Sequence, residues 1–408
     1  MRDWPISGGK DMGIKGLLDG LLFPRPDGQE LESGGVRRGS IDTVFLLLVL
    51  LLLTFGAVMS FSASAVYAEQ FYGDRTYFFK RYLLFAVLSL ALTAPFVVLA
   101  KPDFWRGFGV CMYAGTLFLL VLVLLIGTVG GGAQRWLVIG PLTVQPSELA
   151  KPALVLVLAL VMSKHEDKIA SVKPHGGSFR YGVLLPGGLI AAVCLLVAAE
   201  KHISGLLIIA MLGVGVMFLG GTRLRYLGIM AAAVAAAGCL LILVSSYAQV
   251  RVDTWLHIEQ VDPLGSAWQT LQGLYAIGSG GLFGLGLGNG RQKHGYVSQP
   301  QNDFIFTVIC EELGFLGALV MILLFLALIA RGFRIAAHAP DRFSSLAVYG
   351  ISLKLALQTA LNIAVVTNSM PNTGVSLPFF SSGGTFLAIQ IFEMGIVLSI
   401  SRYSTHKR

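Results

Sequence analysis

The sequence contains ten apolar runs that approach or reach the length needed to cross a bilayer as helices. A transmembrane helix needs about 20 predominantly apolar residues. Only 13% of the 408 residues are charged, about half the share found in soluble domains, so much of the surface must face lipid. The sequence therefore predicts an all-α polytopic membrane protein with about ten spans, at residues 42–63, 78–99, 105–129, 147–163, 180–199, 203–219, 223–246, 304–333, 345–369 and 384–402.

The basic residues predict the orientation of these spans. Lys and Arg are concentrated in alternate loops, which the positive-inside rule places in the cytoplasm. Both termini are then cytoplasmic: a flexible tail at 1–41 precedes a membrane domain at 42–402, and 403–408 follow it. A large extracellular loop, 247–302, separates the seventh and eighth spans. The net charge of +8 is explained by the basic residues of the cytoplasmic loops. The sequence has no basic patches interleaved with aromatic residues, so we expect no nucleic-acid partner.

Two further outer loops, 130–146 and 370–383, are punctuated by Gly and Pro but are not hydrophilic. Irregular backbone at membrane depth is tolerated where it is buried in protein or lines a cavity. We therefore expect both loops to fold back toward the bundle and to line a cavity.

Three carboxylates stand at the start of the eighth predicted span. Asp303 lies at its outer end, where it can cap the helix, face a cavity as a proton acceptor, or do both. On a continuous helix Glu311 and Glu312 would lie about 12 Å deeper. A charge at the bilayer centre costs at least about 2.5–3.5 kcal/mol, so each Glu must be paired, protonated or in a wet cavity. Pairing with Lys151, Lys354 or loop arginines is the commoner explanation.

Other polar residues are predicted to gather near the outer side. Gln134 and Arg135 lie in the second outer loop, and Glu148 and Lys151, one turn apart at the start of the fourth span, can pair with each other. In the ninth span a polar side chain recurs every four residues, which predicts either hydrogen bonds between helices or the wall of a cavity. This stripe consists of Lys354, Gln358 and Asn362.

The glycine series "GSGGLFGLGLGNG" (278–290) has no βαβ context and so does not predict a dinucleotide site. A flexible, close-packed outer loop is the better interpretation. Arg291 and Lys293, which follow it, would then be free to bind a phosphate arriving from the membrane surface.

Four segments together resemble the SEDS family of shape, elongation, division and sporulation proteins. The wording "GLGLG…QK…PQNDFIF", which runs from the second segment into the third, favours its FtsW/SpoVE branch over RodA. The resemblance covers residues 42 to 402. Its segments are "GGAQRWLVIGPLTVQPSELAK" (131–151), "DPLGSAWQTLQGLYAIGSGGLFGLGLGNGRQK" (262–293), "NDFIFTVICEELGFLG" (302–317) and "PNTGVSLPFFSSGGT" (371–385).

The resemblance implies a peptidoglycan glycosyltransferase of the bacterial plasma membrane that polymerises lipid II for cell division and releases the polyprenyl diphosphate. It also implies a class B penicillin-binding protein and other membrane proteins of the division machinery as partners. The family's essential carboxylate falls on Asp303, and its basic residues of "QRW" and "ELAK" fall on Arg135 and Lys151. A divalent cation, Mg²⁺ or Mn²⁺, at Asp303 is left open.

The chain departs from the family pattern at two places. The family motif "EPDxG" is replaced by "EKHISG" (200–205), which keeps Glu200 but has His202 in place of the aspartate, and "SYGGS" is replaced by "SSGGT" (381–385). Alternatives also remain for the function. The same cavity and cations would serve a lipid II flippase, and a non-catalytic division scaffold would need no acid at a cavity mouth. An elongation or sporulation role is the alternative to division.

Overall fold

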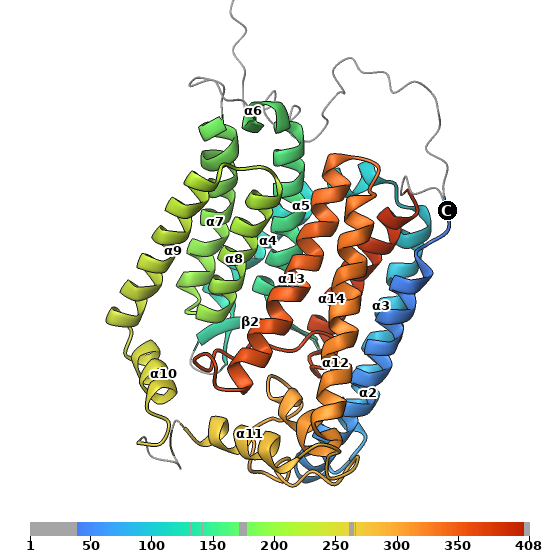
Figure 1. Cartoon of the computed structure of the whole chain (residues 1–408), viewed down its shortest axis with the longest axis vertical. Coiled ribbons are helices and arrows are strands. Elements are labelled where there is room, and N and C mark those ends of the chain that lie inside the picture. Colours follow the sequence, from blue (N-terminus) through green and yellow to red (C-terminus); the bar gives the residue numbers. More distant parts are fainter. Residues whose placement is uncertain are drawn as a thin grey trace, which may run out of the picture. The chain divides into compact units, whose positions relative to one another are not determined.

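The computed structural model describes residues 39–130, 133–140, 142–170, 178–260, 265 and 267–403. Most of them are helical, and every predicted span forms a helix, which confirms the fold class (Figure 1). These helices are α2 (Thr43–Tyr72), α3 (Tyr77–Leu99), α4 (Pro102–Ile126), α5 (Pro146–Lys164), α7 (Leu185–Ala199, preceded by a π-helical turn at Arg180–Leu184), α8 (Ile203–Leu219), α9 (Leu224–Val244), α12 (Ile305–Ala337), α13 (Arg342–Val366) and α14 (Gly384–Ser401).

Within the described part of the chain, eight helices are long and apolar enough to cross a membrane, with α7 and its π-helical turn counted together. Helix α8 and the apolar stretch Leu224–Leu240 of α9 are shorter. The number of ten spans and their orientation therefore remain predictions.

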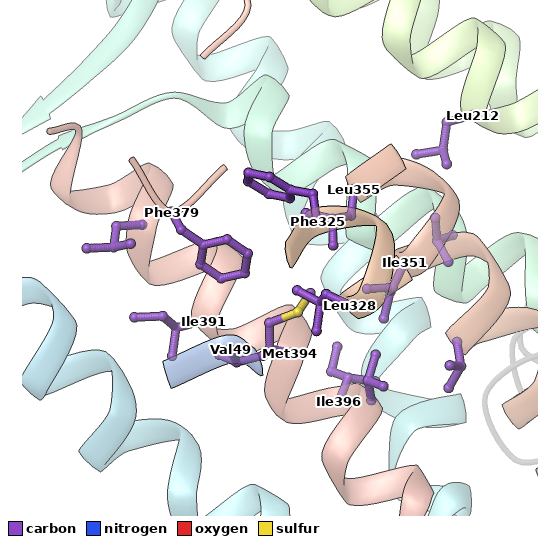
Figure 2. Close-up of a cluster of buried hydrophobic side chains, with 14 of the residues drawn as sticks. Val49, Leu212, Phe325, Leu328, Ile351, Leu355, Phe379, Ile391, Met394 and Ile396 are labelled. Carbon is purple, nitrogen blue, oxygen red and sulfur yellow. The ribbon is translucent and has the colours of Figure 1, made fainter. Parts of the chain in front are cut away.

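Helices α5, α13 and α14 form much of the core. Helix α5 packs against α4, α8 and α13, and most of its side chains are buried. The close contact between α5 and α13 requires glycine at position 350 of α13, because a Cβ there would stand only 2.5 Å from Cγ1 of Val155 on α5. Small residues at such contacts let helices pack closely in lipid, where packing replaces the hydrophobic effect. Phe325, Ile351 and Met394 fill the space between α12, α13 and α14 (Figure 2).

The segment after α13 folds back into the bundle, as the sequence predicted. Phe379 and Phe380 are fully buried, and the Tyr82 hydroxyl on α3 donates a 2.6 Å hydrogen bond to the Phe379 carbonyl. A Cβ at Gly56 on α2 would overlap the same carbonyl. The loop is therefore fixed between α2 and α3, and it carries residues 381–385 to a defined position.

The second outer loop forms a small antiparallel sheet that an all-helical prediction did not include. Its strands are β1 (Thr128–Gly130), β2 (Ala133–Ile139) and β3 (Leu142–Val144), in the order β1-β2-β3. Strand β2 packs against α4 and α5. The loop thus folds back onto the bundle as expected, and the sheet pairs backbone groups that would otherwise lack partners near the membrane.

The predicted outer loop 247–302 is largely structured. It contains α10 (Ser246–Leu256) and α11 (Trp268–Ser279), followed by turns up to the start of α12. In Figure 1, α10 and α11 lie at one end of the bundle and the short helix α6 (Glu166–Ala170) at the other.

Helix α12 is interrupted at Gly314, where we predicted a continuous span. Gly314 has φ 67° and ψ −167°, a conformation that favours glycine. The backbone groups released by this break pair with the glycine-rich loop: Leu285 N–H donates to the Glu311 carbonyl at 3.0 Å, and Phe315 N–H to Gly281 at 2.9 Å. The first nine residues of α12 are thus separated from the long helix that follows.

The two ends of the described chain meet. Gly39 N–H donates to the Arg402 carbonyl at 2.8 Å, and Asp42 N–H donates to the Ser401 hydroxyl at 3.1 Å. Asp42 also caps α2 and pairs with Arg331 of α12. The two ends of the membrane domain therefore lie on one side of it, as predicted. Most of the predicted tail (1–38) and the last residues (404–408) lie outside the described residues.

Candidate functional site

Asp303 lies two residues before the start of α12 and is half-buried against the loop that follows α13. Asn362 on α13 holds it there, because its amide donates 2.7 Å hydrogen bonds to both the Asp303 carbonyl and the Val375 carbonyl. A Cβ at Gly374 would stand 3.4 Å from Asp303 Oδ2. Asn362 thus joins α13 to the loop before α12 and to the loop after α13. We had predicted that it bonds another helix or lines a cavity.

A cation on α10 faces Asp303 from the other side. The guanidinium of Arg251 acts electrostatically on the Asp303 carboxylate and also donates to the Asn372 carbonyl. One turn further on, Trp255 Nε1 donates to the Asn368 carbonyl at 2.9 Å. Burial raises the pKa of Asp303, and the positive charge of Arg251 opposes this rise. Asp303 is thus an acid in a partly desolvated place with one nearby cation.

A cavity of about 190 Å³ opens beside this acid. Asn302, the neighbour of Asp303, lines it and accepts a 2.9 Å hydrogen bond from the Ser382 hydroxyl. Thr385 donates to the Thr143 carbonyl at 2.8 Å, which joins the start of α14 to β3. The lining residues are Arg81, Trp136, Thr143, Gln145, Glu148, Asn302, Ser382, Gly383, Gly384, Thr385 and Phe386. Both predicted cavity loops therefore contribute to its wall.

Glu148 and Lys151 form an ion pair, as their spacing of one helical turn predicted. Lys151 Nζ lies 2.7 and 2.8 Å from the two Glu148 oxygens, and Lys151 is only 1% exposed. Glu148 lines the cavity, whereas Lys151 is buried and contacts Glu148 without lining the cavity itself. Deeper in the bundle, Lys354 pairs with Glu393 of α14 at 2.7 Å. Gln358 is also buried.

Arg135, Glu200 and His202 form a second polar group next to the cavity. Glu200 is 1% exposed, between α7 and α8, and burial raises its pKa to about 8 while the charge of Arg135 opposes the rise. His202 Nδ1 lies 3.0 Å from the Ser147 hydroxyl. Gln134, which precedes Arg135, donates to the Gly127 carbonyl at 2.8 Å and so fixes the end of α4. This group lies around the start of α5.

Glu311 and Glu312 bind the glycine-rich loop. Glu311 accepts hydrogen bonds from the backbone N–H groups of Arg291 and Gln292, at 2.7 and 3.2 Å. Arg291 itself has an exposed side chain. The prediction that Glu311 is paired is confirmed, but the predicted partners are wrong. Its partners are backbone N–H groups and not Lys151, Lys354 or an arginine side chain.

Glu312 accepts hydrogen bonds from the backbone of Gly288, from the Ser62 hydroxyl at 2.6 Å and from Lys293 Nζ at 2.6 Å. Lys293 is buried in this ion pair. The structure therefore places its ammonium in a loop-binding cluster, which contradicts the idea that it is free to bind a phosphate.

The predicted depth of the two glutamates is wrong. Ser62, which binds Glu312, is the 20th residue of α2, and Asn362, which binds Asp303, is the 21st residue of α13. At 1.5 Å per residue both lie about 30 Å from the start of their helices. All three carboxylates therefore lie at the same end of the bundle, in the segment that precedes the break at Gly314.

The described residues contain no group of three or more His, Cys, Asp or Glu side chains arranged to hold a metal. Asp303 remains the one residue that we proposed for a divalent cation, and that proposal stays a hypothesis. The sequence analysis did not select Arg81, Arg251, Glu393 or His202 as site residues. Arg251, Glu393 and His202 contact residues of other helices or loops, so no local spacing indicated a site role for them. Arg81 lies over the ring of Phe85 in its own helix, a contact that does not indicate a cavity.

A model of the cell cycle protein family FtsW/RodA/SpoVE matches residues 42–406. This chain belongs to that family. It is 37% identical to stage V sporulation protein E of Bacillus subtilis, over 91% of this chain and 99% of the relative. It is 39% identical to a probable peptidoglycan glycosyltransferase FtsW of Trichlorobacter lovleyi, over 90% and 94%.

Solved structures of the family share the fold. A chain of a peptidoglycan synthase complex that coordinates polymerization and crosslinking superposes with a TM-score of 0.73 and 27% identity, over 90% of this chain and 99% of that one. The rod shape determining protein RodA of Thermus thermophilus superposes with a TM-score of 0.65 and 26% identity, over 90% and 98%. The FtsW/RodA/SpoVE fold thus covers nearly the whole membrane domain.

Proposed function

We propose that this chain is a peptidoglycan glycosyltransferase that polymerises lipid II. The observation that carries the proposal is the position of Asp303: half-buried, held by Asn362, and next to Asn302 in the cavity wall. Membership of the FtsW/RodA/SpoVE family and the likeness to a chain of a peptidoglycan synthase complex support it.

Asp303 acts as the general base. Its carboxylate takes the proton of a GlcNAc 4-hydroxyl, whose oxygen forms a bond to the anomeric carbon of a MurNAc. The bond from that carbon to the lipid diphosphate breaks, and its electron pair leaves with the diphosphate. A single displacement inverts the anomeric centre. A positioned base contributes roughly 10²–10⁴ in rate, because a neutral hydroxyl is a poor nucleophile.

Cations around the cavity stabilise the departing diphosphate. Arg81 lines the cavity directly, while Arg135 lies close by, next to Glu200. Fixed positive charge in a partly desolvated site stabilises negative charge that develops in the transition state. Lys151 acts through its ion pair with Glu148, and Lys293 belongs to the loop-binding cluster.

The lipid tails of both substrates anchor them in the bilayer, which fits an acid at the end of the bundle about 30 Å from the starts of α2 and α13. We assign this end to the outer face of the bacterial plasma membrane, where the sugars of lipid II lie. A class B penicillin-binding protein is the proposed partner, and cell division is the proposed setting.

The test is glycan synthesis from labelled lipid II by the protein with its partner synthase. We expect chains to lengthen with wild-type protein and with Asp253→Asn, which removes an exposed carboxylate of α10. We expect Asp303→Asn to lower the rate of synthesis by about 10²–10⁴ while it inserts normally. Movement of lipid II across vesicles without longer glycans would establish the flippase instead.

A further inference from the structure

His202 lies between α7 and α8 and is 6% exposed. Its ring covers Gly205, where a Cβ would stand 2.5 Å from the ring nitrogen Nδ1. The same nitrogen lies 3.0 Å from the Ser147 hydroxyl and 3.4 Å from Gln145 Nε2. One ring nitrogen therefore contacts two residues at the start of α5.

The chemistry of these contacts selects one form of the imidazole. With the amide nitrogen of Gln145 as the donor, Nδ1 is the acceptor and the ring proton of the neutral imidazole resides on Nε2. The charged groups that face His202 are Glu148 and Lys151 of α5 and Arg135 of β2. Burial lowers the pKa of His202 to about 4, Glu148 opposes this, and both cations add to it. The imidazole is neutral at pH 7 and keeps its acceptor.

The start of α5 depends on such support. The helix begins at Pro146, and no side-chain cap bonds its first turn. Gln145 and Glu148, on either side of that turn, both line the cavity. His202 is thus placed to determine how these two side chains face a substrate.

We propose that His202 is a positioning residue for substrate binding, which acts by accepting hydrogen bonds from Ser147 and Gln145 and so fixes the start of α5 at the cavity wall. The proposal rests on the proposed function.

Three substitutions separate this role from packing. The amide oxygen of His202→Asn lies near the place of Nδ1, whereas the amide of His202→Gln reaches toward Nε2, and His202→Leu fills the space without accepting. With the full chain, its partner synthase and lipid II, we expect His202→Asn to stay within about twofold of wild-type KM. His202→Gln and His202→Leu raise KM about five- to tenfold, the effect of a lost hydrogen bond, with kcat nearly unchanged.

Ser147→Ala tests the same contact from the other partner and covers the case in which a His202 variant does not fold. It raises KM by no more than His202→Leu does, because the contact with Gln145 remains, and the double variant is no worse than His202→Leu alone, which has already removed the Ser147 contact. Equal KM values for His202→Asn and His202→Gln, or additive effects in the double variant, overturn the inference. Wild-type protein that does not lengthen glycans overturns the proposed function itself.

Discussion

Asp303 and Glu312 lie nine residues apart at the same end of the bundle, yet their surroundings are opposite. Glu312 is fully buried, pairs with Lys293 and accepts hydrogen bonds from Ser62 and the loop backbone. Asp303 is half-buried and, among the described residues, has no ion-pair partner within 4 Å. A carboxylate with all its acceptor sites occupied stabilises a structure, whereas one with sites left over can accept a proton.

The largest structural effect is expected at the buried pair. Glu312→Gln leaves the ammonium of Lys293 buried without its counter-charge, which typically costs about 3–5 kcal/mol in the free energy of unfolding. Thermal unfolding of the purified protein in detergent measures this loss, with Asp253→Asn as the exposed control. A Glu312→Gln protein as stable as the control would show that this carboxylate does not hold the loop.

The glycine-rich loop offers a matched pair for the next effect. Gly284 and Gly288 have φ of 80° and 84°, so alanine at either position costs about 1–2 kcal/mol of backbone strain. A Cβ at Gly284 would also overlap the Glu312 carbonyl, whereas the space around Gly288 is open. Gly284→Ala should therefore lower the unfolding temperature more than Gly288→Ala does. Equal shifts would mean that the loop is not packed against α12.

The smallest effect concerns the cation near Asp303. Because a base works only when ionised, the rate falls as the pH drops through the pKa of Asp303. Burial raises this pKa and Arg251 opposes the rise, so removing the charge in Arg251→Gln raises the pKa further. The acid limb of kcat should move to higher pH, while Arg251→Lys keeps it near the wild-type position. An acid limb unmoved in Arg251→Gln argues against Asp303 as the titrating base.

The sequence predicted the helices well, because ten apolar runs leave little choice in lipid. It also predicted that Asp303 lies at the start of the eighth span and that Glu148 can pair with Lys151, both of which depend on local spacing. It missed the break at Gly314, since an isolated glycine is tolerated in an apolar helix and its φ of 67° depends on the loop that packs there. The partners of Lys293, Lys354 and Arg251 were missed for a related reason: each contact joins distant segments, and only the folded chain brings them together.

The contrast between the two carboxylates is tested most directly by one paired measurement. The initial rate of lipid II polymerisation and the unfolding temperature are determined for Asp303→Asn and Glu312→Gln, each prepared with the partner synthase. We predict that Asp303→Asn loses about 10²–10⁴ in rate and keeps its unfolding temperature, whereas Glu312→Gln unfolds at a clearly lower temperature. An Asp303→Asn protein that polymerises lipid II at the wild-type rate would contradict the account.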